Sequence, residues 1–252
     1  MKNMSEKYLS CSMEYSVAVD EVDFCERLKP SAVLQYFQDL ATEHAETLGI
    51  GFQKMLKSGL IWVLTRLSVK FFRYPIIGEK ITVTTFPRKP HVADAIRDYY
   101  ITDKDGNVII SGSSKWVVID VNNHMIRRCA NLFDFSDEQY IPTEPFENAN
   151  RTLSDKDGQY ECVMSDRVHI CELDRNVHMN NARYGDIMLN AFSVDWLKKH
   201  TIQEFDINFL SELKYGDCYR VFKSDDDSIS FLRAECDDKA SFRAEIHWKE
   251  ND

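Results

Sequence analysis

An internal repeat is the feature of this sequence that most restricts its fold. Residues 69–71 (Val-Lys-Phe) and the pair Gly78-Glu79 are matched by residues 207–209 (Ile-Asn-Phe) and the pair Gly216-Asp217. Both matches have the same spacing, since 207 − 69 and 216 − 78 are each 138. Duplication of one folding unit produces such a constant spacing. We therefore predict that the chain folds as two similar halves.

Each half is predicted to contain a strand, a long helix and then several strands. Alternation of apolar and polar residues indicates strands, and apolar residues three or four apart indicate helices. The first half has strands at 15–22, 59–72, 81–86, 95–102 and 108–120 and a helix at 31–48. The second half has strands at 160–168, 204–213, 219–223, 231–236 and 240–248 and a helix that ends near Leu197. The helices correspond at a spacing of 150 (182 − 32), so the first half has an insertion near residues 51–59.

The two halves are separated by a change in composition. Residues 133–159 are acidic and polar, contain Pro142, Pro145 and Gly158, and show little periodicity. Such a segment is typical of a connection between domains. We predict an α+β protein with one domain at 1–132, a linker at 133–159 and a second domain at 160–252.

A short polar motif precedes the second helix. Asp174, Asn176 and His178 bring together a carboxylate, an amide and an imidazole. Asn180 and Asn181 follow, and Asn is favoured as the cap of a helix N-terminus. The unpaired N–H groups of that terminus stabilise a developing oxyanion. The motif therefore indicates a catalytic site.

Composition excludes several classes of protein. The formal net charge of −10 disfavours binding to nucleic acid. No apolar run approaches the roughly 20 residues that span a bilayer, and residues 1–7 lack the apolar core of a signal peptide. The seven cysteines have no framework spacing, which favours reduced thiols. We expect a cytoplasmic protein without an integral membrane segment.

The motif resembles that of the acyl-ACP thioesterases, the plant fatty acyl-ACP thioesterases and their bacterial relatives. Their second hotdog domain carries D-x-N-x-H-x-N-N-x-x-Y, which is complete here from Asp174 to Tyr184. The resemblance implies two tandem hotdog domains, each an antiparallel sheet wrapped around a central helix. It also implies hydrolysis of acyl-acyl carrier protein to free fatty acid, which terminates fatty-acid synthesis.

The resemblance also supplies a catalytic glutamate, because the family has one in the strand after the motif helix. Glu212 falls on that position, and its counterpart in the first half is Tyr74 (212 − 138). At the helix spacing of 150, the first-half counterparts of the motif's Asp, Asn and His are Phe24, Glu26 and Leu28, so the first half lacks the motif. We therefore predict one active site, in the second half.

The predicted reaction is an attack by water on the thioester carbonyl. Glu212 is the candidate general base, with His178 orienting or sharing the proton, and the sequence leaves the choice between them open. Asn176 would hold the water or the carbonyl, and Asp174 would orient its neighbours. A cysteine nucleophile is the rival mechanism, but Leu213 occupies the family's cysteine position and Cys171 precedes the motif. We expect no cofactor and no metal, because His169, Cys171 and His178 lack the ligand number and spacing of a zinc site.

Substrate contacts are predicted for both parts of an acyl-ACP. The resemblance places the acyl chain in the first half, where Trp62, Leu64, Phe37 and Leu40 are the candidates. An acidic carrier would need a local basic surface, for which the candidates are Arg127, Arg128 and Arg183, with Arg88, Lys89, Lys198 and Lys199. The alternatives are an acyl-CoA thioesterase with the same site and a non-catalytic acyl-thioester-binding hotdog protein. Either a monomer or a homodimer is compatible with the sequence.

Overall fold

The strands of both halves form one continuous antiparallel sheet. The computed structural model describes residues 9–129, 132, 135–141, 147–156 and 158–251. Across the sheet the order is β1-β3-β4-β5-β2-β8-β11-β10-β9-β7, with the short β6 paired to β5. The first five strands come from the first half and the next five from the second, in mirrored order. The parts of the predicted domains and linker at 1–8, 130–131, 133–134, 142–146, 157 and 252 lie outside the described residues.

The elements follow the predicted order in each half. In the first half they are β1 (Cys11–Ser16), α1 (Pro30–Thr47), α2 (Phe52–Lys57), β2 (Leu60–Phe71), β3 (Lys80–Pro87), β4 (Ala95–Thr102), β5 (Val108–Asp120) and β6 (Ile126–Arg127). In the second half they are β7 (Glu161–Arg167), α3 (Arg183–Asn190), α4 (Val194–Lys199), β8 (His200–Phe209), β9 (Cys218–Asp226), β10 (Ile229–Cys236) and β11 (Lys239–Glu250). Single 3₁₀ turns occur at Val19–Glu21, Asp137–Gln139 and Ile170–Glu172.

The two halves meet along β2 and β8. Ser68 lies opposite Asp206, which is its counterpart at the repeat spacing of 138 (206 − 68). On either side, Leu67 lies opposite Ile207 and Val69 lies opposite Phe205. Phe205 and Ile207 are the counterparts of Leu67 and Val69 at the spacing of 138, so the two pairs are related by the repeat. The sequence repeat therefore corresponds to a pseudo-two-fold axis of the structure, which passes between Ser68 and Asp206.

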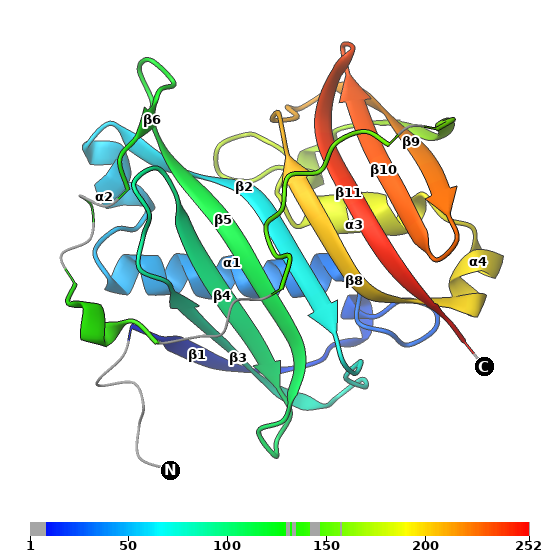
Figure 1. The fold of residues 1–252 in the computed structure, drawn as a ribbon, viewed down its shortest axis with the longest axis horizontal. Helices are drawn as coiled ribbons and strands as arrows, with labels where there is room; N and C mark the ends of the chain where they lie inside the picture. The colour runs from blue at the N-terminus through cyan, green and yellow to red at the C-terminus, as the bar shows by residue number, and fades with distance from the viewer. Residues whose placement is uncertain (1–8, 130–131, 133–134, 142–146, 157, 252) are drawn as a thin grey trace.

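The main core lies between the sheet and the helices, which cover one face of it (Figure 1). Phe37 of α1 stacks on Tyr99 with ring centroids 4.2 Å apart. It lies so close to β5 that a Cβ at Gly112 would be 2.3 Å from its ring. Helices α1 and α3 also meet closely, because a Cβ at Gly185 would be 2.4 Å from the backbone nitrogen of Ser31.

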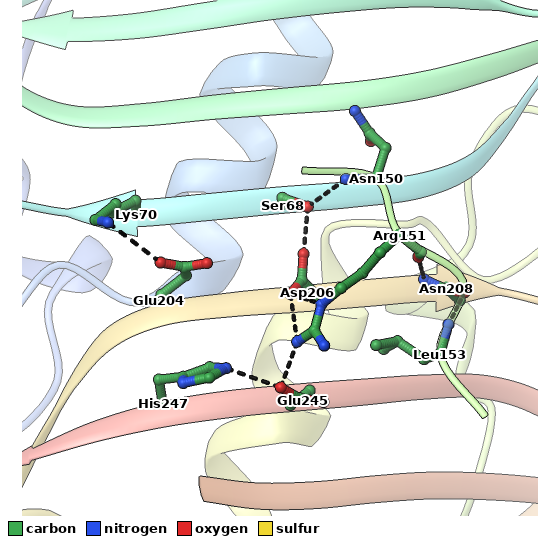
Figure 2. A network of polar contacts seen from close by, with 10 residues as sticks. All are labelled: Ser68, Lys70, Asn150, Arg151, Leu153, Glu204, Asp206, Asn208, Glu245 and His247. Carbon is green, nitrogen blue, oxygen red and sulfur yellow. Dashed lines mark hydrogen bonds and ion pairs between the residues drawn. The ribbon is translucent and has the colours of Figure 1, made fainter. Parts of the chain in front are cut away.

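The described end of the predicted linker crosses the opposite face of the sheet (Figure 1). Figure 2 shows the polar network that holds it there. The guanidinium of Arg151 forms ion pairs with Asp206 of β8 and Glu245 of β11. Asn150 donates from its backbone nitrogen to the Ser68 hydroxyl, and Asn208 accepts from the backbone nitrogen of Leu153. This segment therefore fastens β2, β8 and β11 together at the seam.

The structure corrects three predicted boundaries. The strand predicted at 15–22 lies at Cys11–Ser16, because the Glu21 carboxylate accepts from the backbone nitrogen of Ala18 and closes a 3₁₀ turn. The second helix does not run unbroken to Leu197: Ser193 caps a new helix, α4, by accepting from the backbone nitrogen of Trp196. The strand predicted at 204–213 ends at Phe209, which leaves Glu212 in the following loop.

Candidate active site

A large cavity lies between the first-half helices and the motif of the second half. Its volume is about 1130 Å³, above the roughly 300–1,000 Å³ of most small-molecule pockets. The first half contributes residues of α1, α2, β2, β4 and β5 to its walls. The second half contributes the loop of residues 174–181 and residues 209–212, which begin at the last residue of β8. The motif residues Asp174, Asn176 and His178 all line it, together with Glu212. The structure thus brings the four predicted catalytic residues to one cavity.

Asp174 organises the motif loop through its carboxylate. Its Oδ1 accepts from the backbone nitrogens of Asn176 at 2.8 Å and His178 at 3.1 Å. Its Oδ2 accepts from the side-chain amide of Asn176 at 3.2 Å. The loop turns at Val177, whose φ is +64°. Asp174 therefore fixes the positions of the two residues that follow it in the motif.

Glu212 is held beside His178 by its neighbours in the chain. Leu213 is 1% exposed, and its carbonyl accepts from the backbone nitrogen of Met179 at 2.8 Å. His178 and Lys214 form an antiparallel bridge. As a result Oε2 of Glu212 lies 3.3 Å from Nδ1 of His178, with the Glu212 side chain 53% exposed and that of His178 27% exposed. The pair has access both to solvent and to the cavity.

The start of α3 uses most of its backbone donors internally. Ala182, not an asparagine, is the N-cap, and the Oδ1 of Asn180 accepts from its backbone nitrogen at 2.9 Å. The carbonyl of Asn180 accepts from the backbone nitrogen of Arg183, and that of Asn181 from Tyr184. Over the described residues, the backbone N–H of Asn181 has no hydrogen-bond acceptor in the protein. Asn181 also lines the cavity.

A second copy of the motif loop exists in the first half. Asp23 Oδ1 accepts from the backbone nitrogens of Cys25 and Arg27, as Asp174 Oδ1 does from those of Asn176 and His178. Glu26 has a φ of +60° and corresponds to Val177. The loops therefore correspond at a spacing of 151 (174 − 23), and the predicted equivalents Phe24, Glu26 and Leu28 are each wrong by one residue.

The first-half loop has a structural role in place of a catalytic one. Arg27 occupies the position of His178 and donates to the carbonyls of Leu197 at 2.8 Å and His200 at 2.6 Å. Tyr74 occupies the position of Glu212, and its hydroxyl donates to the carbonyl of Ile202 at 2.7 Å. Arg27 and Tyr74 thus attach the first half to the end of α4 and the start of β8.

The predicted acyl-chain residues fall into two groups. Trp62 and Leu64 line the cavity, and the indole nitrogen of Trp62 donates to the carbonyl of Ile50 at 3.0 Å. Phe37 and Leu40 are 1% and 0% exposed, pack in the core and are not among the residues that line the cavity. The sequence did not separate the groups, because all four residues suit either location.

Sequence reasoning missed a contact between the halves at the cavity. The guanidinium carbon of Arg175 lies 4.0 Å from the ring centroid of Phe52, and both residues line the cavity. Phe52 begins α2, the helix formed by the insertion near residues 51–59. Arg175 occupies a variable position of the motif, so its pairing with an inserted helix had no sequence signal.

The predicted docking cations are exposed or half-buried but do not form one cluster. Arg127 pairs with Asp120 and Arg183 with Asp186, while Arg128 is exposed. Arg88 pairs with Asp98, Lys89 with Asp137 and Lys198 with Asp195. Helix α4, which carries Lys198 and Lys199, lies at the opposite end of the molecule from β6 (Figure 1). Lys198 and Lys199 therefore cannot share a small docking face with Arg127 and Arg128.

The cysteine side chains lie outside the cavity wall. All seven cysteines are free, and the cavity wall contains none of them. Within the described ranges, no three His, Cys, Asp or Glu side chains are grouped closely enough to hold a metal ion. Among the same residues, every helix is too short or too polar to span a bilayer.

Comparisons with known proteins give matches to both halves of the chain. Residues 9–134 match the family model of the acyl-ACP thioesterase N-terminal domain, and residues 156–250 match that of the C-terminal domain. An acyl-[acyl-carrier-protein] hydrolase of Cuphea viscosissima is 26% identical over 209 residues, which are 80% of this chain and 42% of that protein. Oleoyl-acyl carrier protein thioesterase 1 of Arabidopsis thaliana is 24% identical over 233 residues, which are 85% of this chain and 64% of that protein. The chain thus spans less than two thirds of the length of these two relatives.

Solved structures confirm the predicted fold. An acyl-ACP thioesterase from Bacteroides thetaiotaomicron superposes with a TM-score of 0.86 at 22% identity, covering 96% of this chain and 98% of that one. The 12:0-ACP thioesterase from Umbellularia californica gives 0.84 at 19% identity, with the same coverage. The chain therefore has the α+β architecture of two hotdog units in tandem.

Proposed function

Because the chain belongs to the acyl-ACP thioesterase family, we propose that it hydrolyses the thioester of fatty acyl groups bound to acyl carrier protein. The product would be free fatty acid, whose release ends elongation. The observation that carries this proposal is the position of Glu212, 3.3 Å from His178 on the wall of a cavity of about 1130 Å³. A general base next to a cavity with a largely apolar lining suits hydrolysis at the head of an acyl chain.

Hydrolysis proceeds through a tetrahedral intermediate in this proposal. Water attacks the thioester carbonyl carbon and gives its proton to the Glu212–His178 pair. The carbonyl oxygen becomes an oxyanion and accepts a hydrogen bond from the free N–H of Asn181, the kind of donor that contributes roughly 10²–10³ in rate. The intermediate collapses with loss of the thiolate, which the protonated pair then protonates. Asp174 acts as a positioning residue, since its carboxylate is occupied by the loop.

Two assignments of the proton acceptor fit this pair. Glu212 can take the proton directly, or it can orient His178 through Nδ1 so that the other ring nitrogen takes it. In the second case the arrangement of base and orienting carboxylate is that of a catalytic triad without its nucleophile. The absence of cysteine from the cavity wall favours water over a covalent acyl-enzyme in either case.

The acyl chain is proposed to run into the first half, past Trp62 and Leu64. Met55 of α2 and Ala41 and Ala45 of α1 line the same cavity. Each buried CH₂ contributes about 0.8 kcal/mol, so two further carbons favour the longer chain by roughly fifteenfold where the cavity has room. Phe37 and Leu40 are left out of this proposal because they pack in the core.

The carrier is proposed to dock through Arg127, Arg128 and Arg183, although Arg127 and Arg183 already have acidic neighbours. The net charge of −10 makes a local basic surface necessary for an acidic partner.

A cytoplasmic location stays a prediction, and so does the choice between monomer and homodimer. The alternative of an acyl-CoA thioesterase differs only in the carrier.

The test is release of free thiol from a panel of acyl-ACPs with chains of eight to eighteen carbons, beside the matching acyl-CoAs. We expect turnover that peaks at one chain length and is faster with the carrier protein. Faster turnover of acyl-CoA would select the alternative carrier. Tight acyl-thioester binding without turnover on either carrier would contradict hydrolysis and identify a binding module.

A further inference from the structure

The cavity contains a buried cation that the proposed hydrolysis does not use. Arg97 of β4 is 8% exposed and lines the cavity wall. Its Nη1 donates to Nδ1 of His44 at 2.9 Å and to the hydroxyl of Thr85 at 3.2 Å. Among the described residues, no Asp or Glu carboxylate lies within 4.0 Å of its guanidinium. Buried arginines are rarely left without an acidic partner, because isolation of the charge from water is costly.

The neighbours of Arg97 cannot supply the missing negative charge. Burial and the adjacent guanidinium lower the pKa of His44 to about 3, so its imidazole is neutral at ordinary pH. Asp98, the next residue, pairs with Arg88 and accepts from Ser113. An arginine has five N–H donors, and Nη1 alone makes the contacts described. Donors therefore remain for a molecule in the cavity.

The position of Arg97 places it far along the path of an acyl chain. In the sheet order β4 is separated from β2 by β5, so Arg97 lies about 10 Å beyond β2 along the sheet. The motif loop enters the cavity from the second half, and its Arg175 reaches α2, which packs on β2 and not on β4. An atom bound by Arg97 would therefore belong to the distal part of the chain, away from the thioester.

We propose that Arg97 forms a subsite for a neutral oxygen, a hydroxyl or keto group, on the distal part of the acyl chain. This inference rests on the proposed thioesterase function. A neutral group is favoured over a carboxylate because Asp39 and Glu43 line the same cavity. Gln38 and Thr42 of α1 also line it and add uncharged hydrogen-bonding groups. The cavity therefore offers polar side chains besides the apolar Trp62, Leu64 and Met55.

The test compares hydroxylated and plain acyl-ACPs of equal length, with the hydroxyl placed at successive carbons. In the wild type, kcat/KM should be about tenfold higher or more for the best-placed hydroxyl, the effect of a hydrogen bond to a charged donor. Arg97→Gln and Arg97→Lys should reduce that preference. The preference is the ratio of kcat/KM for the hydroxylated chain to kcat/KM for the plain chain. Both values are measured on one preparation, so the fraction of unfolded protein cancels from the ratio. Arg66→Gln is the control, since Arg66 donates to Asn150 on the opposite face of the sheet; its ratio should stay at the wild-type value.

A second measurement separates this inference from the proposed function. Amide analogues of the acyl-pantetheines, in which NH replaces the sulfur, resist hydrolysis and report binding alone. If no thioester is cleaved but the hydroxylated amide binds more tightly and Arg97→Gln removes the difference, the subsite stands and the hydrolysis proposal fails. Equal binding of plain and hydroxylated chains at every position would overturn the subsite, and so would a preference unchanged in both variants. Preference for a carboxyl-ended chain would overturn the choice of a neutral oxygen.

Discussion

Val177 shows how the motif loop is shaped at the level of a single residue. The Asp174 carboxylate can accept hydrogen bonds from the backbone nitrogens of both Asn176 and His178 only if the chain turns sharply between these two residues. The turn requires a positive φ at Val177, a conformation that β-branched residues rarely adopt. Strain of this kind is often stored at functional sites. Glu26 has the same φ in the first-half loop, so the turn belongs to the duplicated unit and not to catalysis alone.

Val177→Gly should stabilise the protein, contrary to the usual effect of glycine. Relief of the left-handed conformation, about 1–2 kcal/mol, exceeds the entropic cost of glycine, about 0.5–1 kcal/mol. We expect the free energy of unfolding in urea to rise by about 0.5–1 kcal/mol. Val194→Gly is the control, because Val194 is also exposed but lies in α4, where glycine should destabilise. A loss of stability in both variants would show that Val177 is unstrained.

At the scale of elements, the two motif loops have diverged from one common structure. Each follows a 3₁₀ turn, is closed by an aspartate and leads into a helix. In the second half, His178 and Glu212 face the cavity that α2 helps to enclose. In the first half, Arg27 and Tyr74 replace them and bind backbone carbonyls at the junction of α4 and β8. In the proposed function, the second-half loop is the catalytic site, whereas the first-half loop attaches the halves to each other.

Substitutions in the first-half loop should therefore affect stability and leave turnover per folded molecule nearly unchanged. Tyr74→Phe removes one buried hydrogen bond, and the expected loss is about 1–2 kcal/mol. Arg27 also forms a largely buried ion pair with Asp23 at 2.9 Å. Arg27→Met leaves that carboxylate without its cation, and we expect a loss of about 3 kcal/mol. Arg73→Gln, which breaks an exposed pair with Glu79, should cost less than about 1 kcal/mol. Urea unfolding and kcat/KM are measured on the same preparations, and a large fall in kcat/KM at constant stability would assign these residues to catalysis.

The sequence predicted much of this organisation, and its errors have physical causes. The repeat predicted the order of the long helices and the main strands, and the resemblance to acyl-ACP thioesterases predicted the fold and selected Glu212, which lies 3.3 Å from His178. The loop equivalence was missed by one residue, because Asp23, Cys25 and Arg27 share only the aspartate with Asp174, Asn176 and His178. The break before α4 depends on a single hydrogen bond at Ser193. The separation of Trp62 and Leu64 from Phe37 and Leu40 depends on the cavity, which no local pattern encodes.

At the scale of the whole molecule, the halves are joined by the seam between β2 and β8 and by the polar network over it (Figure 2). Arg151 binds both Asp206 and Glu245, and Nε2 of His247 lies 2.8 Å from Glu245. The network holds Glu245 ionised, with its pKa lowered to about 2 by hydrogen bonds from His247 and Arg151 that outweigh the effect of burial. The hydrogen bond with Glu245 in turn raises the pKa of His247 above its ordinary value of 6.5.

This network should make stability depend on pH near neutrality. Because the folded pKa of His247 is raised, its contribution is fully present below about 6.5 and is lost as the pH rises through the raised pKa. The urea midpoint of the wild type should therefore fall over that range, while His247→Gln should show a smaller fall. His124→Gln, at an exposed turn residue, serves as the control and should follow the wild type. A wild-type midpoint that is constant over the range would contradict the linkage.

We propose that this duplicated fold has one active site, which lies in its second half. The most direct measurement is kcat/KM on the best acyl-ACP for the wild type, Glu212→Gln and the pseudo-symmetric variant Tyr74→Phe. We expect a loss of about a hundredfold or more for Glu212→Gln and little change for Tyr74→Phe. Full turnover in Glu212→Gln, with a loss in Tyr74→Phe, would contradict it.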